Sequence, residues 1–383
     1  MASASTLPAP DQVTVPRLDR DPIPAASLDH EQLLVRRGRR SGVYTVIAVH
    51  STRLGPALGG CRLHAYPHLS AAVADALRLS SAMTLKAAAA GLDLGGGKGV
   101  ICLPPAEPAP TGMRRREILL DFADAVAALD GAYVTAEDVG TSADDMVVVA
   151  ERTPHVTGLP RSRGGSGDPS PVTAEGVEAA LRASSHEVFG SRDLAGRSVA
   201  IVGTGHVGSA LARRLAAAGA ELVLADVDPA APRALSDLPG ARWATPEQAL
   251  VAEVDVLAPC ALGGIIDDRS AAGLRCPIVC GAANNQLAEE RLADELAGRG
   301  ILYAPDFVVN AGGLINISLE RGGAYDPGRA HAAVGAIESL LERIFRMAEF
   351  AGITPLAAAR RIADQRLSAA APPRARSSPS APA

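Results

Sequence analysis

Lysine is almost absent from this 383-residue chain. Of its 37 basic residues only Lys86 and Lys98 are lysine, and the other 35 are arginine. Arginine stays protonated in proteins, whereas the pKa of a lysine ammonium falls readily when the group is desolvated or lies beside another cation. Both lysines fall in one stretch, MTLKAAAAGLDLGGGK at 83–98, with no other basic residue between them. The pattern indicates amines that must titrate; compositional drift towards arginine, with two chance survivors, is the alternative.

Other scarcities exclude whole classes of protein. The five cysteines are odd in number and scattered, which argues against a disulfide framework or a paired zinc site, so no metal is expected and a reduced, cytoplasmic setting is predicted. No run of about 20 apolar residues occurs, so no membrane association is predicted. The formal net charge is −5 and aromatic residues make up only 3% of the chain. Without a basic stripe interleaved with aromatics, nucleic-acid binding is not expected.

The remaining pattern is that of an α/β protein with two groups of elements, separated by a turn-rich hinge or cleft lip at 158–171. Residues 1–27 and the tail at 371–383 are predicted to be disordered by composition. Before the hinge, strands are predicted at 31–37, 43–51, 99–103 and 132–135, and helices at 70–83 and 114–129. After it, strands are predicted at 197–203, 221–226, 255–259, 278–281 and 302–305, and helices at 173–189, 207–218, 330–350 and 355–367.

The residues around Lys98 suggest a reactive site. Three successive glycines, Gly95 to Gly97, precede it, and core packing does not readily account for them. They predict a turn in which backbone N–H groups crowd one point. Asp138 follows the strand at 132–135, where catalytic acids of α/β proteins often lie, although residues there more often cap the next helix.

The sequence GTGHVG at 203–208 is typical of a dinucleotide-binding turn, because it follows a predicted strand and opens a predicted helix. Gly203 and Gly205 would let a pyrophosphate approach the helix N-terminus, and Gly208 would let the helix pack on the sheet. Asp226 ends the next strand 23 positions after Gly203. Its carboxylate would bind ribose hydroxyls and repel a 2′-phosphate, so NAD is the expected cofactor; a Rossmann-like domain without a nucleotide is the alternative.

Three later strands end in polar or glycine-containing loops, PCALGG, GAANNQ and PDFVVNAGG. In a parallel sheet these carboxyl ends share one crevice with the dinucleotide. Asn284, Asn285 and Asn310 are therefore expected to face that crevice, and ordinary turn asparagines are the alternative.

Taken together, these segments resemble the leucine/valine/phenylalanine dehydrogenase branch of the glutamate dehydrogenase superfamily. The matches run in order from about Val43 to Leu367: LGPALGG, MTLKAAAAGLDLGGGK, VTAEDVG, GDPSP, APCALGG, GAANNQL and YAPDFVVNAGGLIN. The resemblance implies that Lys86 holds the substrate carboxylate, that Lys98 is the general base, and that Asp138 exchanges protons with Lys98. It also implies a carboxylate site shaped by Gly59 and Gly60, and a substrate side chain surrounded by Leu58, Ala136, Leu314 and Ile317, with Asn285 nearby. The cofactor contacts it implies are Gly203, Thr204, Gly205, His206, Val207, Gly208, Asp226, Thr173 at the carboxamide, Cys260, Ala261, Asn285 and Asn310.

The same resemblance implies a two-domain α/β architecture. An N-terminal mixed-sheet domain, residues 1–157, would carry both lysines and the contacts of a homo-oligomer. A Rossmann NAD-binding domain would span 158–331, and helices within 332–370 would return to the first domain. The cleft between the domains would hold the small-molecule substrate and close by hinge motion.

The reaction implied is the reversible NAD-dependent oxidative deamination of an L-amino acid to its 2-oxo acid and ammonium. Two cationic lysines in one cleft would lower the pKa of one of them, which makes a neutral amine available as a base. The apolar pocket predicts a valine- or leucine-like substrate, with phenylalanine or tryptophan as the alternative, since one methylene changes binding by only about 1–3 kcal/mol. A hydroxy-acid dehydrogenase is disfavoured because neither His186 nor His206 has a catalytic context. A non-catalytic relative that binds NAD or an amino acid is the other rival.

The chain departs from the family pattern at Ala87, Gly99, Asp168 and His206, and across 317–326. None of these differences removes a chemical group that the reaction requires. They bear instead on substrate choice and rate.

Overall fold

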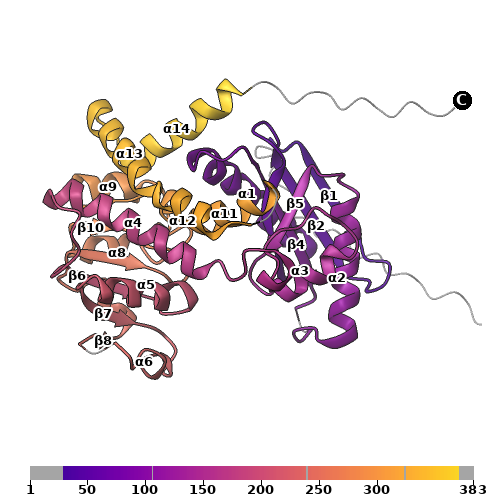
Figure 1. Cartoon of the computed structure of the whole chain (residues 1–383), viewed down its shortest axis with the longest axis horizontal. Helices are drawn as coiled ribbons and strands as arrows, with labels where there is room; N and C mark the ends of the chain where they lie inside the picture. The colour runs from indigo at the N-terminus through magenta and orange to yellow at the C-terminus, as the bar shows by residue number, and fades with distance from the viewer. Residues whose placement is uncertain (1–28, 106, 239, 323–324, 371–383) are drawn as a thin grey trace, which may run out of the picture.

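The computed structural model describes residues 29–105, 107–238, 240–322 and 325–370, and contains two sheets, each covered by helices. Figure 1 shows the two sheets in separate halves of the molecule, with α11 (Gly312–Ser318) and α12 (Pro327–Gly335) between them. The segments 1–27 and 371–383, predicted to be disordered, lie outside the described residues. No helix in the described part of the chain is long and apolar enough to cross a membrane.

The first sheet is mixed, with the strand order β1-β2-β4-β3-β5. Its β1 and β4 run antiparallel to β2, whereas β3 runs parallel to β4 and to β5. Helix α1 packs on one face, and α2 and α3 pack on the other. The elements are β1 (Gln32–Arg37), β2 (Tyr44–Ser51), β3 (Ala57–Ala65), α1 (Leu69–Ala89), β4 (Gly95–Leu103), α2 (Gly112–Ala127), β5 (Tyr133–Glu137) and α3 (Ala143–Ala150).

Helix α1 is longer than the sequence pattern predicted, because it continues past Met83 to Ala89. The side chain of His68 caps its first turn by accepting from the backbone N–H of Ala71 over 3.1 Å. Helical alanines follow Lys86, and the helix ends just before Gly91, whose φ is +77°. Lys86 therefore lies within the last turn of a rigid element rather than in the loop after it.

The prediction that the triple glycine forms a turn is wrong, because Gly95 to Gly97 are the first residues of strand β4. Their lack of side chains is a packing requirement. A Cβ at Gly96 would lie 2.1 Å from the backbone nitrogen of Thr84 in α1, and one at Gly97 would lie 2.6 Å from the ring of Tyr133. Gly99 is constrained in the same way, since a Cβ there would lie 2.7 Å from the ring of Phe122. Glycine is thus what lets a helix and two aromatic rings lie directly against β4.

The second sheet is parallel and has the strand order β11-β10-β9-β6-β7-β8, as expected for a Rossmann domain. Each strand predicted after the hinge is present, and β8 is an additional short edge strand. The strands are β6 (Ser198–Val202), β7 (Glu221–Ala225), β8 (Arg242–Ala244), β9 (Val256–Pro259), β10 (Ile278–Val279) and β11 (Leu302–Tyr303). The helices are α4 (Ser170–Phe189), α5 (His206–Ala217), α6 (Ala231–Ala234), α7 (Pro246–Leu250), α8 (Asp268–Gly273), α9 (Leu292–Gly298) and α10 (Asp306–Val309).

The C-terminal helices connect the two halves. The helix predicted at 330–350 is divided into α12 and α13 (Ile337–Ala351), and α13 packs on α4. Helix α14 (Pro355–Ala369) packs on α1, where Arg366 Nη1 donates to the carbonyl of Leu92 over 2.6 Å. The chain therefore returns to the helix that carries Lys86 (Figure 1).

Candidate active site

Strand alternation puts the predicted catalytic groups on the face of the first sheet that α1 covers. Successive residues of a strand face opposite sides, and Val100 of β4 packs with α1 whereas Ile101 packs with α2. Lys98 therefore shares the α1 face with Gly96 and Val100. The same alternation brings Leu58, Gly60 and Arg62 of β3 to this face, because Leu58 packs with Ala87 of α1 whereas Cys61 lies in the opposite core.

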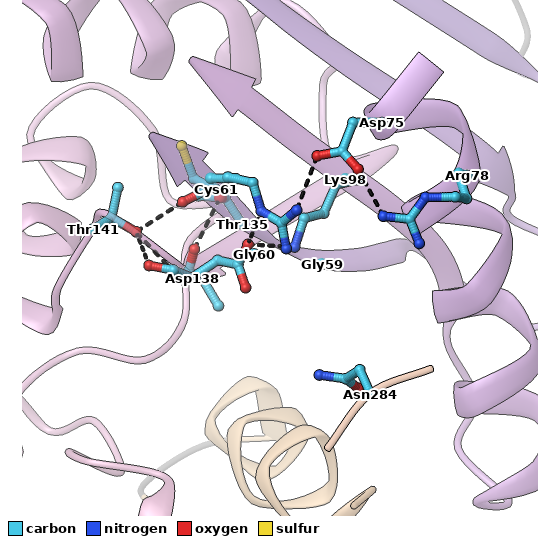
Figure 2. A network of polar contacts seen from close by, with 12 residues as sticks. Gly59, Gly60, Cys61, Asp75, Arg78, Lys98, Thr135, Asp138, Thr141 and Asn284 are labelled. Atoms are coloured by element: carbon cyan, nitrogen blue, oxygen red, sulfur yellow. Dashed lines mark hydrogen bonds and ion pairs between the residues drawn. The ribbon is translucent and has the colours of Figure 1, made fainter. Parts of the chain in front are cut away.

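Lys98 forms an ion pair with Asp138 on this face. Its Nζ donates to Asp138 Oδ2 over 2.7 Å, and the lysine is only 5% exposed. The backbone N–H of Asp138 donates to Thr141 Oγ1 over 2.9 Å, which fixes the loop after β5 (Figure 2). Burial alone would raise the pKa of Asp138, but the charges and hydrogen bonds of Lys98 and Arg62 outweigh it and hold the pKa below its usual value.

Lys86 faces the Rossmann half of the molecule from the last turn of α1. Its Nζ donates to Asn284 Oδ1 over 3.0 Å, and the same oxygen accepts from Asn310 Nδ2 over 2.9 Å. Desolvation lowers the pKa of Lys86 to about 8; the negative charge of Asp306 opposes this shift and the positive charge of Lys98 adds to it. The lowered pKa thus falls on Lys86, the lysine that the resemblance assigns to the substrate carboxylate, and its largest cause is desolvation rather than the second lysine.

Charges that the sequence analysis did not single out surround the pair. Arg62 Nε donates to the same oxygen of Asp138 over 3.1 Å, and Asp75 of α1 accepts from Arg62 Nη1 over 2.9 Å. Asp306, the first residue of α10, is buried, and its Oδ2 accepts from the backbone of Gln286 over 3.0 Å. Burial raises the pKa of Asp306. Arg62 could hardly be recognised among 35 arginines, and the available signal was its place two residues after Gly60 in the sequence.

Gly59 and Gly60 pack tightly between β4 and β5. A Cβ at Gly59 would lie 1.7 Å from the carbonyl oxygen of Gly97, and one at Gly60 would lie 2.6 Å from that of Glu137. The buried hydroxyl of Tyr133 donates to the carbonyl of Gly59 over 2.6 Å. The two glycines thus let three strands approach one another directly beside Lys98 and Asp138.

Three of the four residues predicted around the substrate side chain pack together. Leu58, Leu314 and Ile317 share one apolar cluster with Ala87. Ala136 is buried on β5, paired with Gly60 and on the same side of its strand as Val134, which belongs to that cluster. The altered segment at 317–326 contributes Glu320, whose carboxylate accepts from the backbone of Gly158 over 2.9 Å and of Ser166 over 2.8 Å. Glu320 therefore ties the hinge segment to the 3-10 turn that follows α11.

The turn at 203–208 has the shape of a pyrophosphate cradle. Gly203 has a φ of +100°, and a Cβ on it would lie 2.6 Å from the backbone nitrogen of Ala261. A Cβ on Gly208 would lie 1.9 Å from the carbonyl of Gly203, so α5 packs closely on the turn. Gly205 caps α5, and a Cβ there would meet no described atom within 4 Å. The open helix N-terminus, with His206 and Val207 as its first residues, fits a dinucleotide phosphate.

The other predicted cofactor residues lie around the same crevice. Asp226 follows β7, and its Oδ2 accepts from the backbone N–H of Thr204 over 2.6 Å. Asn310 is 7% exposed, and its Oδ1 has no hydrogen-bond partner in the described part of the chain, so it is available to an amide donor. Thr173 lies in the first turn of α4, where its Oγ1 donates to the carbonyl of Pro169 over 2.9 Å. Asn285 is an exposed residue with a φ of +50°. Cys260 and Ala261 follow β9 beside Gly203.

Comparison with known proteins decides the family. The family model described as Glu/Leu/Phe/Val dehydrogenase, dimerisation domain, matches residues 31–155, and that of glutamate/leucine/phenylalanine/valine dehydrogenase matches residues 224–326. The chain is also 43% identical over 340 residues to a leucine dehydrogenase of Thermoactinomyces intermedius, a match that covers 88% of this chain and 91% of that protein. The chain belongs to the glutamate/leucine/phenylalanine/valine dehydrogenase family.

Further relatives in this family span most of the chain. A valine dehydrogenase of Streptomyces virginiae is 45% identical over 342 residues, with 88% of this chain and 94% of that protein covered. The crystal structure of L-tryptophan dehydrogenase from Nostoc punctiforme superposes with a TM-score of 0.76 at 37% identity, covering 90% of this chain and 97% of that chain. These matches confirm the predicted family, the two-domain α/β fold and the assignment as an NAD-dependent amino acid dehydrogenase.

One match concerns the hydroxy-acid dehydrogenase alternative. The family model described as D-isomer specific 2-hydroxyacid dehydrogenase, NAD binding domain, matches residues 174–261, which is the nucleotide-binding unit alone. The half of the chain that carries Lys86, Lys98 and Asp138 matches the amino acid dehydrogenase family instead. A common Rossmann unit accounts for both matches, since this unit serves many dehydrogenases.

Proposed function

We propose that the enzyme catalyses the reversible oxidative deamination of branched-chain L-amino acids, with Lys86 binding the substrate carboxylate, Lys98 acting as the base and Asp138 exchanging protons with Lys98. The observation that carries the proposal is the arrangement of the two lysines. Lys98 is buried and paired with Asp138, whereas Lys86 bonds only to neutral Asn284 among the described residues. One amine therefore has a proton-exchange partner, and the other keeps a free charge for an anion.

Lys86 binds and orients the substrate. Its ammonium is a compact charge held in the last turn of α1, suited to a carboxylate. A bound carboxylate would replace the partial charge of Asn284 by a full negative charge and so favour the protonated lysine. Binding of the amino acid is thus expected to stabilise the charged form of Lys86.

Lys98 and Asp138 handle the protons. NAD held by the turn at 203–208 and Asp226 would supply the hydride acceptor for the substrate Cα. The α-amino group must first lose a proton, and the water that later attacks the imine carbon must lose another. Neutral Lys98 can accept each proton, and the carboxylate of Asp138, 2.7 Å away, stabilises the resulting ammonium and relays the proton onward.

The apolar cluster that contains Leu58, Leu314 and Ile317 supports an aliphatic side chain. The similar relatives named as leucine and valine dehydrogenases, at 43% and 45% identity, agree with that size range. Because a structurally similar tryptophan dehydrogenase is 37% identical, aromatic amino acids are included among the substrates to be tested. NADH absorbance at alkaline pH should therefore give the highest kcat/KM with valine or leucine among Val, Leu, Ile, Phe and Trp. A strong preference for an aromatic amino acid would contradict the pocket assignment, and no turnover with any of them would favour a non-catalytic relative.

Replacing Lys86 by methionine should raise the KM of the amino acid about 10–100-fold, because a charge-assisted hydrogen bond is worth about 1.5–3 kcal/mol. In the wild type, the pKa of Lys86 is about 8, so its charge is lost as the pH rises through that value and KM should increase. Lys86→Arg cannot deprotonate, so its KM should stay nearly constant from about pH 7 to about pH 10. Initial rates over this range measure both variants. A wild-type KM that does not change with pH while that of Lys86→Met does would contradict the assignment.

The substitution Lys86→Met, which should weaken substrate binding, should make the folded protein more stable. The pKa of Lys86 is lower in the folded protein than in the unfolded chain, so folding disfavours its protonated form. The penalty is fully present below about pH 8 and disappears as the pH rises towards the unfolded value of 10.5. The free energy of unfolding of Lys86→Met should therefore exceed that of the wild type by about 1 kcal/mol at neutral pH. The variant should unfold at a correspondingly higher denaturant concentration.

Replacing Asp226 by serine should lower kcat/KM with NAD by about 10–100-fold, because ribose hydroxyls would lose a charged acceptor. The ratio of activity with NADP to activity with NAD should rise, since the carboxylate no longer repels a 2′-phosphate. Steady-state rates with both cofactors test this. Asp228→Asn, two residues further on and exposed, is the control and should leave the ratio unchanged. An unchanged ratio in Asp226→Ser would remove the assigned role.

The domain boundaries and the assembly are part of the same proposal. We assign residues 1–157 and the helices in 332–370 to the catalytic unit, and residues 158–331 to the Rossmann unit. The family model that matches residues 31–155 is described as a dimerisation domain, which supports a homo-oligomer formed by the first unit. Light scattering of the purified protein should give a mass of two or more chains of 39.1 kDa each, and the mass of a single chain would contradict the proposed homo-oligomer.

A further inference from the structure

Arg62 connects the Lys98–Asp138 pair to a second set of charges. Its Nε donates to Asp138 Oδ2 over 3.1 Å, and its Nη1 donates to Asp75 Oδ2 over 2.9 Å. Asp75 Oδ1 accepts from Arg78 Nη2 over 2.8 Å. Positive and negative groups therefore alternate from Lys98 of β4, through the loop after β5 and through β3, to Arg78 of α1.

The distribution of bonds on Asp138 is unequal. Lys98 and Arg62 both donate to Oδ2, and Oδ1 has no hydrogen-bond partner among the residues that the structure describes. A carboxylate held by two donors on one oxygen has a defined orientation, because rotation would break both bonds. Oδ1 is consequently the oxygen that can meet substrate or water.

Arg62 is itself held in place. Asp75, which fixes its outer nitrogen, accepts from the hydroxyl of Tyr66 over 2.7 Å on the same oxygen. Burial and the hydrogen bond to Asp75 raise the pKa of Tyr66, and Tyr66 and Arg78 help to hold the pKa of Asp75 below its usual value although burial opposes them. Arg62 thus lies between two ionised carboxylates, and its guanidinium can address both because its donors form a rigid fork.

We propose that Arg62 is a positioning residue for the deamination, which fixes the direction of the Asp138 carboxylate and favours its return to the ionised form after each proton exchange with Lys98. The inference rests on the proposed roles of Lys98 and Asp138. A lysine and a carboxylate 2.7 Å apart can share one proton in two ways. The permanent positive charge of Arg62 beside the carboxylate favours the arrangement in which Lys98 carries the proton and Asp138 is ionised.

The charges around the Lys98–Asp138 pair determine the direction in which the pH dependence of kcat/KM should shift when one of them is removed. Three other titratable groups respond to the charge of Lys98 or Asp138: Lys86 of α1, Cys61 of β3 and Tyr133 of β5. Asp306 of α10 acts on Lys86, and Arg115 of α2 and Asp145 of α3 act on Cys61. Each stays in place when Arg62 or Asp75 is replaced. The two substitutions therefore change the local charge by one unit in opposite directions.

Arg62→Met removes a positive charge that disfavours an added proton anywhere on the Lys98–Asp138 pair, so the pair as a whole should keep its proton to higher pH. The ascending limb of kcat/KM against pH, in the direction of deamination, should move to higher pH by roughly half to one unit. At a pH below the limb this is a loss of about 3–10-fold. kcat should fall further at every pH, because Oδ1 of Asp138 is no longer directed.

Asp75→Asn removes a negative charge on the other side of Arg62. The local potential becomes more positive, so the ascending limb should move to lower pH while kcat also falls, because Arg62 loses its anchor.

Arg62→Lys keeps the positive charge but lacks the two donor nitrogens that bind Asp138 and Asp75 at once. Its limb should return to near the wild-type position while kcat stays reduced.

Arg116→Gln is the matched control, because Arg116 makes two hydrogen bonds to Glu151 in an exposed pair of the same half of the molecule. Its pH profile should match the wild type. Identical limbs in Arg62→Met, Asp75→Asn and wild type, or limbs of the two variants that move in the same direction, would overturn the inference and leave a structural role only. The proposed function fails separately, if Lys98→Arg remains active.

Discussion

Replacing Lys98 by arginine is expected to lower kcat for oxidative deamination by about 10²–10⁴-fold, the usual contribution of a general base. Arginine keeps the positive charge and can still pair with Asp138, but it does not release a proton in a protein. The substitution therefore removes proton transfer and leaves the ion pair. Single-turnover formation of NADH measures the loss.

NADH binding is the control for Lys98→Arg, because the nucleotide turn at 203–208 lies in the other sheet. Fluorescence titration should give the wild-type dissociation constant. Lys98→Ala should lose activity to a similar extent and also some stability, since Asp138 would keep only Arg62 as its cation. If Lys98→Arg kept more than about a tenth of the wild-type kcat, the base would have to be another group.

Replacing Gly96 by alanine should destabilise the protein by about 3 kcal/mol or more, because overpacking against backbone atoms cannot be relieved by a side-chain rotation. The new Cβ would lie 2.1 Å from the nitrogen of Thr84 and 2.5 Å from the carbonyl oxygen of Ser80. Helix α1 would have to move away from β4. Lys86 lies two residues after Thr84 and Lys98 two residues after Gly96, so the same movement would separate the two lysines.

Denaturant unfolding and kinetics together test this packing. Gly335→Ala is the matched control: Gly335 lies in α12, and a Cβ there would meet no described atom within 4 Å. Alanine at that site should stabilise the helix by roughly 0.5–1 kcal/mol. If Gly96→Ala were as stable and as active as the wild type, the close contact between α1 and β4 would be contradicted.

The two sheets differ in how much of their structure follows from local sequence patterns, and the reason is physical. In the Rossmann half, the nucleotide turn and Asp226 each follow a strand at a short spacing, so local periodicity predicted β6, α5 and β7 and the turn between them. In the first half, the functional face is formed by strands from distant parts of the chain. Strand β3, at 57–65, has no clear alternation in its sequence ALGGCRLHA and was not predicted.

The triple glycine shows the limit most directly. Glycine is required both in tight turns and where another backbone lies very close, and the sequence does not distinguish these two demands. The turn was the more familiar explanation. Only the position of Thr84 and of the Tyr133 ring shows that close packing is the reason.

By itself, the sequence determined the chemical inventory of this protein: two lysines in a chain of arginines, a carboxylate at 138, and a nucleotide turn followed by Asp226. These depend on residue type and short spacing, which are present before the chain folds. The tertiary structure decided which of the 35 arginines meets Asp138, and that burial lowers the pKa of Lys86. Both depend on the face of a strand and on burial, and these exist only once α1 has packed on the sheet and α14 has returned to α1.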